Sequence, residues 1–128
     1  AARGRAVTEL GCGTALCALT AARAGARWAL ATDNNPLPLD LAARAAAEQG
    51  LPLRTQLLDL AGRAPLRAGP DLVIATDVCY STDVARALAR RCGEALDAGV
   101  DTVVVADSVN IARGAFEEAA RARGLRAR

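Results

Sequence analysis

Four acidic residues stand at similar places in this sequence, each just after a short apolar run, and they are the first candidates for chemistry. They are Asp33, Asp59, Asp77 and Asp107. If the apolar runs are parallel strands, their carboxyl ends lie along one edge of a sheet, and the four carboxylates meet there. The sequence contains no histidine and no lysine. Four carboxylates on one edge, with no histidine or lysine, suit hydroxyl, amine and cationic ligands better than phosphates.

A glycine loop ends the first apolar run, in the stretch Glu9-Leu10-Gly11-Cys12-Gly13. Glycine lets the backbone turn tightly and approach a ligand, because no Cβ stands in the way. We expect a helix to begin near Thr14, with its unpaired N–H groups facing the same loop. A dinucleotide loop has the pattern G-x-G-x-x-G, and Leu16 occupies its third glycine position. The loop therefore indicates a nucleotide-like ligand and fits a dinucleotide poorly.

Apolar runs and helical patterns alternate along the chain. We expect strands at residues 6–10, 27–32, 53–58, 71–76 and 100–106. We expect helices at residues 14–24, from Pro36 (capped by Asn35) to Gly50, from Ser81 or Thr82 to Gly99, and at residues 113–123, with a loop at residues 60–70. This alternation predicts an α/β fold, a doubly wound parallel sheet with helices on both faces, in one domain spanning residues 1–128.

Composition and charge exclude several classes of protein. The net charge of +2 is small and scattered, which argues against nucleic acid as a partner. No apolar run approaches the roughly 18 residues of a membrane span, so we expect a soluble protein without a membrane partner. The cysteines have no CxxC spacing and no histidine company, which predicts free thiols and no metal site; they are Cys12, Cys17, Cys79 and Cys92. The chain does not begin with Met, and we expect it to be a piece of a longer or processed chain.

The acidic-x-G-x-G pattern of residues 9–13 resembles motif I of the class I S-adenosylmethionine-dependent methyltransferases. Asp33 matches that family's ribose-binding acid and Asp59 its adenine-contacting acid, while Ala15 departs from a further glycine of many members. The resemblance implies a Rossmann-like fold with strand order 3-2-1-4-5 and S-adenosyl-L-methionine as the cofactor. The cofactor-binding residues that it implies are Glu9, Gly11, Cys12, Gly13, Asp33, Asn34, Asp59, Leu60 and Thr76.

A second stretch, residues 71–80, narrows the resemblance to one group within this family. Its apolar strand ends in D-x-x-Y, at Asp77 and Tyr80, which is similar to the fourth-strand signature of the seven-β-strand protein-lysine methyltransferases. The likeness is greatest to those that act on the β subunit of electron transfer flavoprotein. It implies a protein partner that presents a lysine, Asp77 and Tyr80 as the catalytic residues, and a cytoplasmic or mitochondrial location. It also implies that the antiparallel strand pair completing the family's sheet is missing from this chain.

Simpler interpretations of the same residues stay open. Glu9 fits a strand-end carboxylate satisfied by backbone N–H groups, Asp33, Asp59 and Asp77 fit helix or turn caps, and Tyr80 fits a packed aromatic residue at the rim. Three other functions remain as well: a nucleotide-sugar or NAD-binding Rossmann protein, a methyltransferase-like module without catalysis, and a small-molecule N-methyltransferase.

Overall fold

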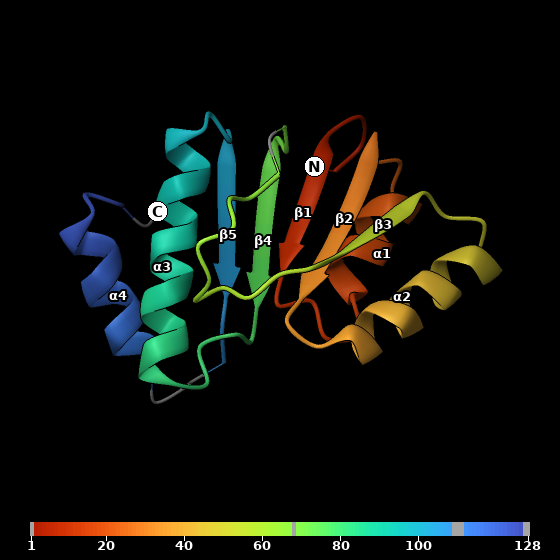
Figure 1. Ribbon diagram of the computed structural model, residues 1–128. Coiled ribbons are helices and arrows are strands. Elements are labelled where there is room, and N and C mark those ends of the chain that lie inside the picture. Colours follow the sequence, from red (N-terminus) through yellow and green to blue (C-terminus); the bar gives the residue numbers. More distant parts are fainter. Residues whose placement is uncertain (1, 68, 109–111, 127–128) are drawn as a thin grey trace.

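Five parallel strands form a sheet in the order β3-β2-β1-β4-β5 (Figure 1). The computed structural model describes residues 2–67, 69–108 and 112–126. The strands are β1 (Ala6–Leu10), β2 (Trp28–Asp33), β3 (Leu53–Leu57), β4 (Leu72–Thr76) and β5 (Thr102–Ala106). All four pairings are parallel, so the predicted strand order and direction are confirmed, and the carboxyl ends share one edge of the sheet. Within the described residues the sheet has no antiparallel strand.

The helices begin where their sequence signals place them, with one exception. They are α1 (Leu16–Arg23), α2 (Pro36–Glu48), α3 (Thr82–Asp97) and α4 (Arg113–Ala122). The side chain of Asn35 accepts the N–H of Leu37 at 3.0 Å, and the hydroxyl of Ser81 accepts the N–H of Val84 at 3.3 Å. These are ordinary N-caps that satisfy otherwise unpaired donors. The Asn35 cap was predicted, and Ser81 was one of the two residues predicted for the other cap.

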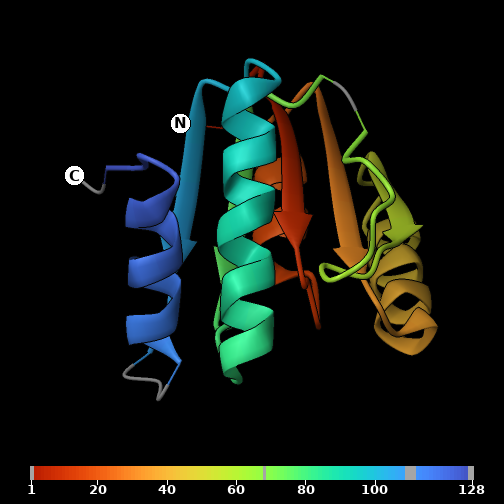
Figure 2. The same ribbon diagram turned by 60° about the vertical axis from the view of Figure 1, so that its left-hand side comes forward.

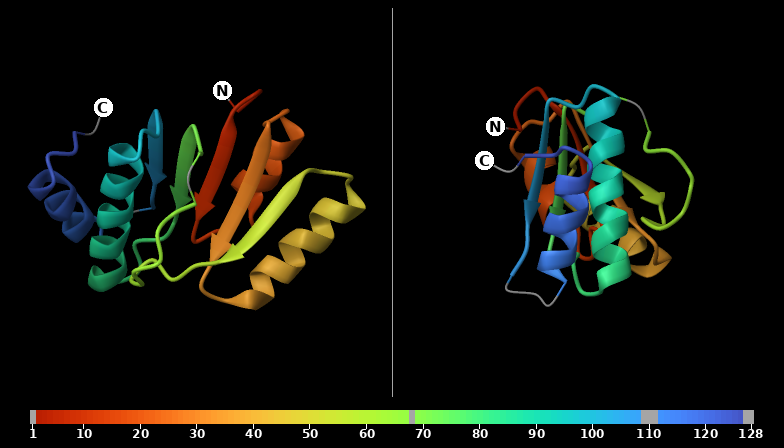
Figure 3. Two further views of the ribbon diagram at one scale, coloured as in Figure 1. Left: turned by 45° about the horizontal axis from the view of Figure 1, so that its top comes forward. Right: turned by 90° about the vertical axis from the view of Figure 1, so that its left-hand side faces the viewer.

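The two faces of the sheet are covered by different helices (Figure 3). Val7 of β1 packs with Ala21 of α1, whereas Leu10 of the same strand packs with Val73 of β4 and Leu88 of α3. Side chains alternate along a strand, so residues 7 and 10 face opposite sides. Toward α1 and α2 the core consists mainly of small side chains, which lets both helices lie close to the sheet; it contains Ala18, Ala22, Ala29, Ala31, Leu39 and Ala42.

The connection from β3 to β4 contains no helix in its described residues, 58–67 and 69–71, as the sequence predicts. We call this segment the crossover coil. It passes over the same face of the sheet as α3, and Leu58 and Leu66 pack into the cluster that contains Leu88 of α3 (Figures 1 and 2). The coil therefore occupies the place that a crossover helix takes in an ordinary βαβ unit.

Two of the predicted starts are wrong by two residues. The first helix begins at Leu16 and not near Thr14, because Gly11, Gly13 and Ala15 all have left-handed φ values, of 62°, 49° and 56°. The last strand begins at Thr102 and not at residue 100, because the N–H of Val100 donates to the carbonyl of Ala95 and so closes the end of α3. No helix among the described residues has both the length and the apolar character needed to cross a membrane.

Candidate functional site

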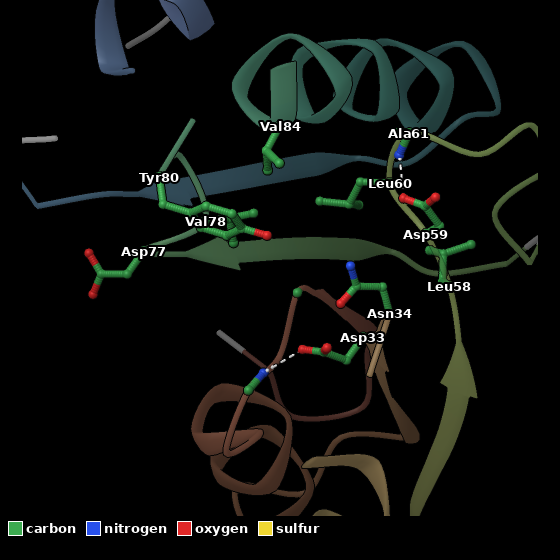
Figure 4. Close-up of a pocket in the computed structure, with 12 residues that line it drawn as sticks. Asp33, Asn34, Leu58, Asp59, Leu60, Ala61, Asp77, Val78, Tyr80 and Val84 are labelled. Atoms are coloured by element: carbon green, nitrogen blue, oxygen red, sulfur yellow. Dashed lines mark hydrogen bonds between the residues drawn. The ribbon is translucent and has the colours of Figure 1, made fainter. Parts of the chain in front are cut away.

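A pocket of about 270 Å³ opens at the carboxyl edge of the sheet, between the glycine loop, the end of β2, the start of the crossover coil and the loop after β4 (Figure 4). Eight of the predicted site residues line it: Gly11, Gly13, Asp33, Asn34, Asp59, Leu60, Asp77 and Tyr80. Four further residues that the sequence did not single out also line it: Leu58, Ala61, Val78 and Val84. Three predicted residues are not part of the lining, namely Glu9, Cys12 and Thr76.

The glycine loop is shaped by a hydrogen bond to the next strand. The N–H of Gly13 donates to Asp33 Oδ2 at 3.0 Å, and the N–H of Asn35 donates to Asp33 Oδ1 at 2.9 Å. The Asn34 side chain points into the pocket beside them (Figure 4). A Cβ at Gly13 would stand in open space, whereas a Cβ at Gly11 would lie 3.1 Å from Cγ2 of Val78. The loop thus brings bare backbone to the pocket, with Asp33 as its nearest carboxylate.

Glu9 lies inside the protein. Its side chain is 1% exposed, and Oε2 accepts the N–H of Ala18, in the first turn of α1, at 2.8 Å. Burial raises the pKa of the Glu9 carboxyl, and hydrogen bonds from Ala18 and Cys17 oppose this shift only in part. These contacts match the simpler interpretation, in which a strand-end carboxylate is satisfied by backbone N–H groups. Glu9 orients α1 against the sheet.

Cys12 and Thr76 lie next to the pocket without lining it. Cys12 is buried, burial raises the pKa of its thiol to about 12, and its N–H donates to the carbonyl of Thr32 at 2.8 Å. The Thr76 hydroxyl lies 3.9 Å from Sγ of Cys17. With a pKa of about 12, the Cys12 thiol is protonated at neutral pH and is not a nucleophile.

The crossover coil forms the wall opposite the glycine loop. Asp59 Oδ1 accepts the N–H of Ala61 at 2.9 Å, which folds the start of the coil into a tight turn. Leu58 and Leu60 add apolar surface there, and Val78 and Val84 continue it on the neighbouring wall. The pocket is therefore apolar between acidic groups, a lining that suits a flat ring with polar edges.

The loop after β4 is held by two carboxylates. Asp77 has a left-handed φ of 52°, and its Oδ1 accepts the N–H of Ser108 at 2.9 Å. Asp107 Oδ2 accepts the N–H of Cys79 at 2.8 Å, so the ends of β4 and β5 are joined twice. Hydrogen bonding from Ser108 lowers the pKa of Asp77. In Figure 4 the Asp77 carboxylate points away from Asp33, toward the outer side of the pocket.

The charge of the site is negative. Three carboxylates line the pocket, those of Asp33, Asp59 and Asp77, and no arginine does. Such a lining attracts cations and hydrogen-bond donors and disfavours phosphate. Among the described residues, no group of three or more His, Cys, Asp or Glu side chains is arranged to hold a metal ion.

Comparisons in sequence find no matching protein-family model and no matching curated protein. Solved structures do match. A TehB-like SAM-dependent methyltransferase from Corynebacterium glutamicum superposes with a TM-score of 0.76 at 22% identity, over 94% of this chain and 65% of that one. A SAM-dependent methyltransferase from Mesorhizobium loti gives 0.57 at 25% identity, over 69% and 40%. The [4+2]-cyclase SpnF gives 0.69 at 19% identity, over 95% and 51%.

These neighbours define the fold. The chain has the Rossmann-like fold of the class I S-adenosylmethionine-dependent methyltransferases, with the strand order 3-2-1-4-5. It spans between two fifths and two thirds of the length of these three neighbours. One of them is a cyclase, so the fold alone does not specify the reaction. None of the three is described as acting on a lysine, so the resemblance to protein-lysine methyltransferases stays a prediction.

Proposed function

We propose that this chain binds S-adenosyl-L-methionine in the pocket and forms the cofactor-binding part of a methyltransferase that acts on a lysine side chain of a protein. One observation carries the proposal: the glycine loop and Asp33 are joined by a hydrogen bond at the mouth of a pocket that contains three carboxylates and no cationic side chain. The fold neighbours described as SAM-dependent methyltransferases support the same cofactor.

The residues present suit this cofactor. The open backbone at Gly13 leaves room for its methionine part. Each oxygen of Asp33 accepts one backbone N–H and keeps a second lone pair for a ribose hydroxyl. Asp59 and Leu60 stand where they can contact the edge and the face of a base. When bound, the cofactor supplies an electrophilic methyl group on a sulfonium.

The acceptor side of the proposal rests on Asp77 and Tyr80. Asp77 is exposed with a lowered pKa, so it is ionised at neutral pH and can hold an amine in place by charge and hydrogen bonding. For the same reason it is a weak base, and we assign it orientation of the amine. Tyr80 is 66% exposed, so a long side chain entering from another protein can lie against it with its cation over the ring face.

Two measurements test the proposal. Calorimetric titration with S-adenosylmethionine should show one site, and titration with NAD should show none. Binding of NAD without binding of S-adenosylmethionine would make the chain a dinucleotide-binding Rossmann protein. The second measurement is a methyl-transfer assay with labelled cofactor and a cell extract, with Asp77→Asn as the matched control. Label on protein lysine supports the proposal, label confined to small amines indicates a small-molecule N-methyltransferase, and binding without transfer indicates a non-catalytic module.

A further inference from the structure

Arg91 is a charged side chain with no exposed surface, on the face of α3 that covers the crossover coil. A buried guanidinium is costly unless its donors are paired. Arg91 donates to four backbone carbonyls of the coil and to one carboxylate. Its partners are Asp59 O at 3.1 Å, Leu60 O at 3.0 Å, Gly62 O at 2.7 Å, Ala64 O at 2.7 Å and Glu94 Oε2 at 3.0 Å.

The neighbouring Arg90 binds the same part of the coil. Its Nη2 donates to Leu60 O at 2.7 Å and to Gly62 O at 2.8 Å. Its Nη1 pairs with Glu94 Oε1 at 2.5 Å, so Glu94 holds both arginines from one turn further along α3. The two guanidinium groups and Glu94 form one network, which we call the arginine clamp.

The clamp replaces the hydrogen bonds that a helix would provide. A crossover helix satisfies most of its carbonyls with its own N–H groups. Of the coil carbonyls at 59, 60, 62 and 64, only that of Asp59 accepts an N–H from the described part of the coil, that of Gly62 at 3.1 Å. The arginines supply these donors from α3. The carbonyls therefore turn toward α3, and the clamped segment includes Asp59, Leu60 and Ala61, which line the pocket.

We infer that Arg91, assisted by Arg90, is a positioning residue that sets the base-side wall of the pocket and through it the preference for adenine over other bases. The inference rests on the proposed function, because it assumes that the base lies against this wall. Arg91 is not part of the pocket lining and acts only through the coil. When the clamp is weakened, the coil shifts, and the Asp59 carboxylate loses its fixed distance from an amino group on the base.

The test compares two ligands that differ only at the base, S-adenosylhomocysteine and S-inosylhomocysteine, in which a carbonyl replaces the adenine amino group. The wild-type protein should bind the adenine ligand more tightly. Arg91→Lys keeps the charge and loses the planar fork of donors, and it should reduce the ratio of the two Kd values by about tenfold, the value of one hydrogen bond. A variant that only unfolds more easily weakens both ligands by the same factor and leaves this ratio unchanged.

Two further variants complete the experiment. Arg90→Gln changes a partly exposed side chain that donates to the same carbonyls, so it keeps the test available if Arg91→Lys does not fold, and it should reduce the ratio in the same direction. Arg86→Gln changes an exposed arginine of the same helix and should leave the ratio as in the wild type.

Hydrogen exchange without ligand separates the inference from the proposed function. Amides of residues 58–64 and 66 should exchange faster in the clamp variants and not in Arg86→Gln. If the wild type binds neither ligand, the proposed function fails, whatever the exchange shows. If the wild type prefers adenine and the clamp variants keep the wild-type ratio, the inference is overturned, even where their exchange is faster.

Discussion

The carboxylate of Asp33 accepts the N–H of Gly13 across 3.0 Å and so ties the end of β2 to the loop that follows β1. Its other oxygen accepts the N–H of Asn35 at the start of α2. One side chain therefore shapes the glycine loop and the entry to the next helix together. The loop is arranged before any ligand arrives, which lowers the entropic cost of binding.

Asp33→Ala should weaken binding of S-adenosylmethionine by about 1.5 to 3 kcal/mol, because it removes charge-assisted hydrogen bonds and releases the loop. Asp33→Asn is the matched control: its one carbonyl oxygen keeps part of the acceptor function, so its loss should be smaller. Calorimetry measures both. Unchanged affinity in Asp33→Ala would remove Asp33 from the site.

Asp77→Asn should lower turnover by about a hundredfold and leave the Kd of the cofactor nearly unchanged, since the negative charge that orients the amine is lost. Asparagine tolerates the left-handed φ of 52° and can still accept the N–H of Ser108, so the loop keeps its shape. Steady-state kinetics and calorimetry on the same preparation check the split. Equal losses in kcat and cofactor affinity would place Asp77 on the cofactor side.

Gly11→Ala and Gly13→Ala form a matched pair in the same loop. Both place a Cβ on a left-handed residue, which costs roughly 1–2 kcal/mol. Gly11→Ala should cost more, because its Cβ meets Val78 at 3.1 Å whereas that of Gly13→Ala meets open space. Urea unfolding measures both free energies. Adding Val78→Ala should reduce the cost of Gly11→Ala and leave the cost of Gly13→Ala unchanged. A double-mutant cycle without coupling between residues 11 and 78 would contradict the contact.

Glu9→Gln should change how stability depends on pH. The pKa of Glu9 is raised by burial above its ordinary value of 4.5, so between that pH and the folded-state pKa the folded protein binds more protons than the unfolded chain. Wild-type stability therefore falls as pH rises through this window. Glutamine does not titrate and can still accept the N–H of Ala18. The free energy of unfolding of Glu9→Gln minus that of the wild type should therefore rise from pH 4 to pH 7. A difference that is constant or falls over this range would contradict the raised pKa of Glu9.

The carboxyl-edge site could be predicted because it follows from local pattern and one rule of topology. Parallel strands carry their ends to the same edge, so acids placed after the runs at residues 27–32, 53–58 and 71–76 had to meet there. The Asn35-Pro36 cap and the glycine loop are equally local signals. For this reason most of the predicted pocket residues lie in its lining.

The positions that the sequence could not place depend on which surfaces pack together. Glu9 looks like a ligand contact in sequence, but its side chain faces the side of the sheet that α1 covers, and strand alternation alone does not say which helix lies there. Val84 reaches the pocket only because the start of α3 packs into the same apolar cluster as Leu58 and Leu60 of the crossover coil.

By itself, the sequence determined the alternation of strands and helices and the acidic edge with its glycine loop, since these depend on neighbouring residues and on chain direction. Only the tertiary structure decided what Arg91 does. In sequence it is one of sixteen arginines, and its role depends on a coil about thirty residues earlier whose carbonyls need donors from outside the coil. Contacts between segments so far apart are set by packing, and no local pattern records them.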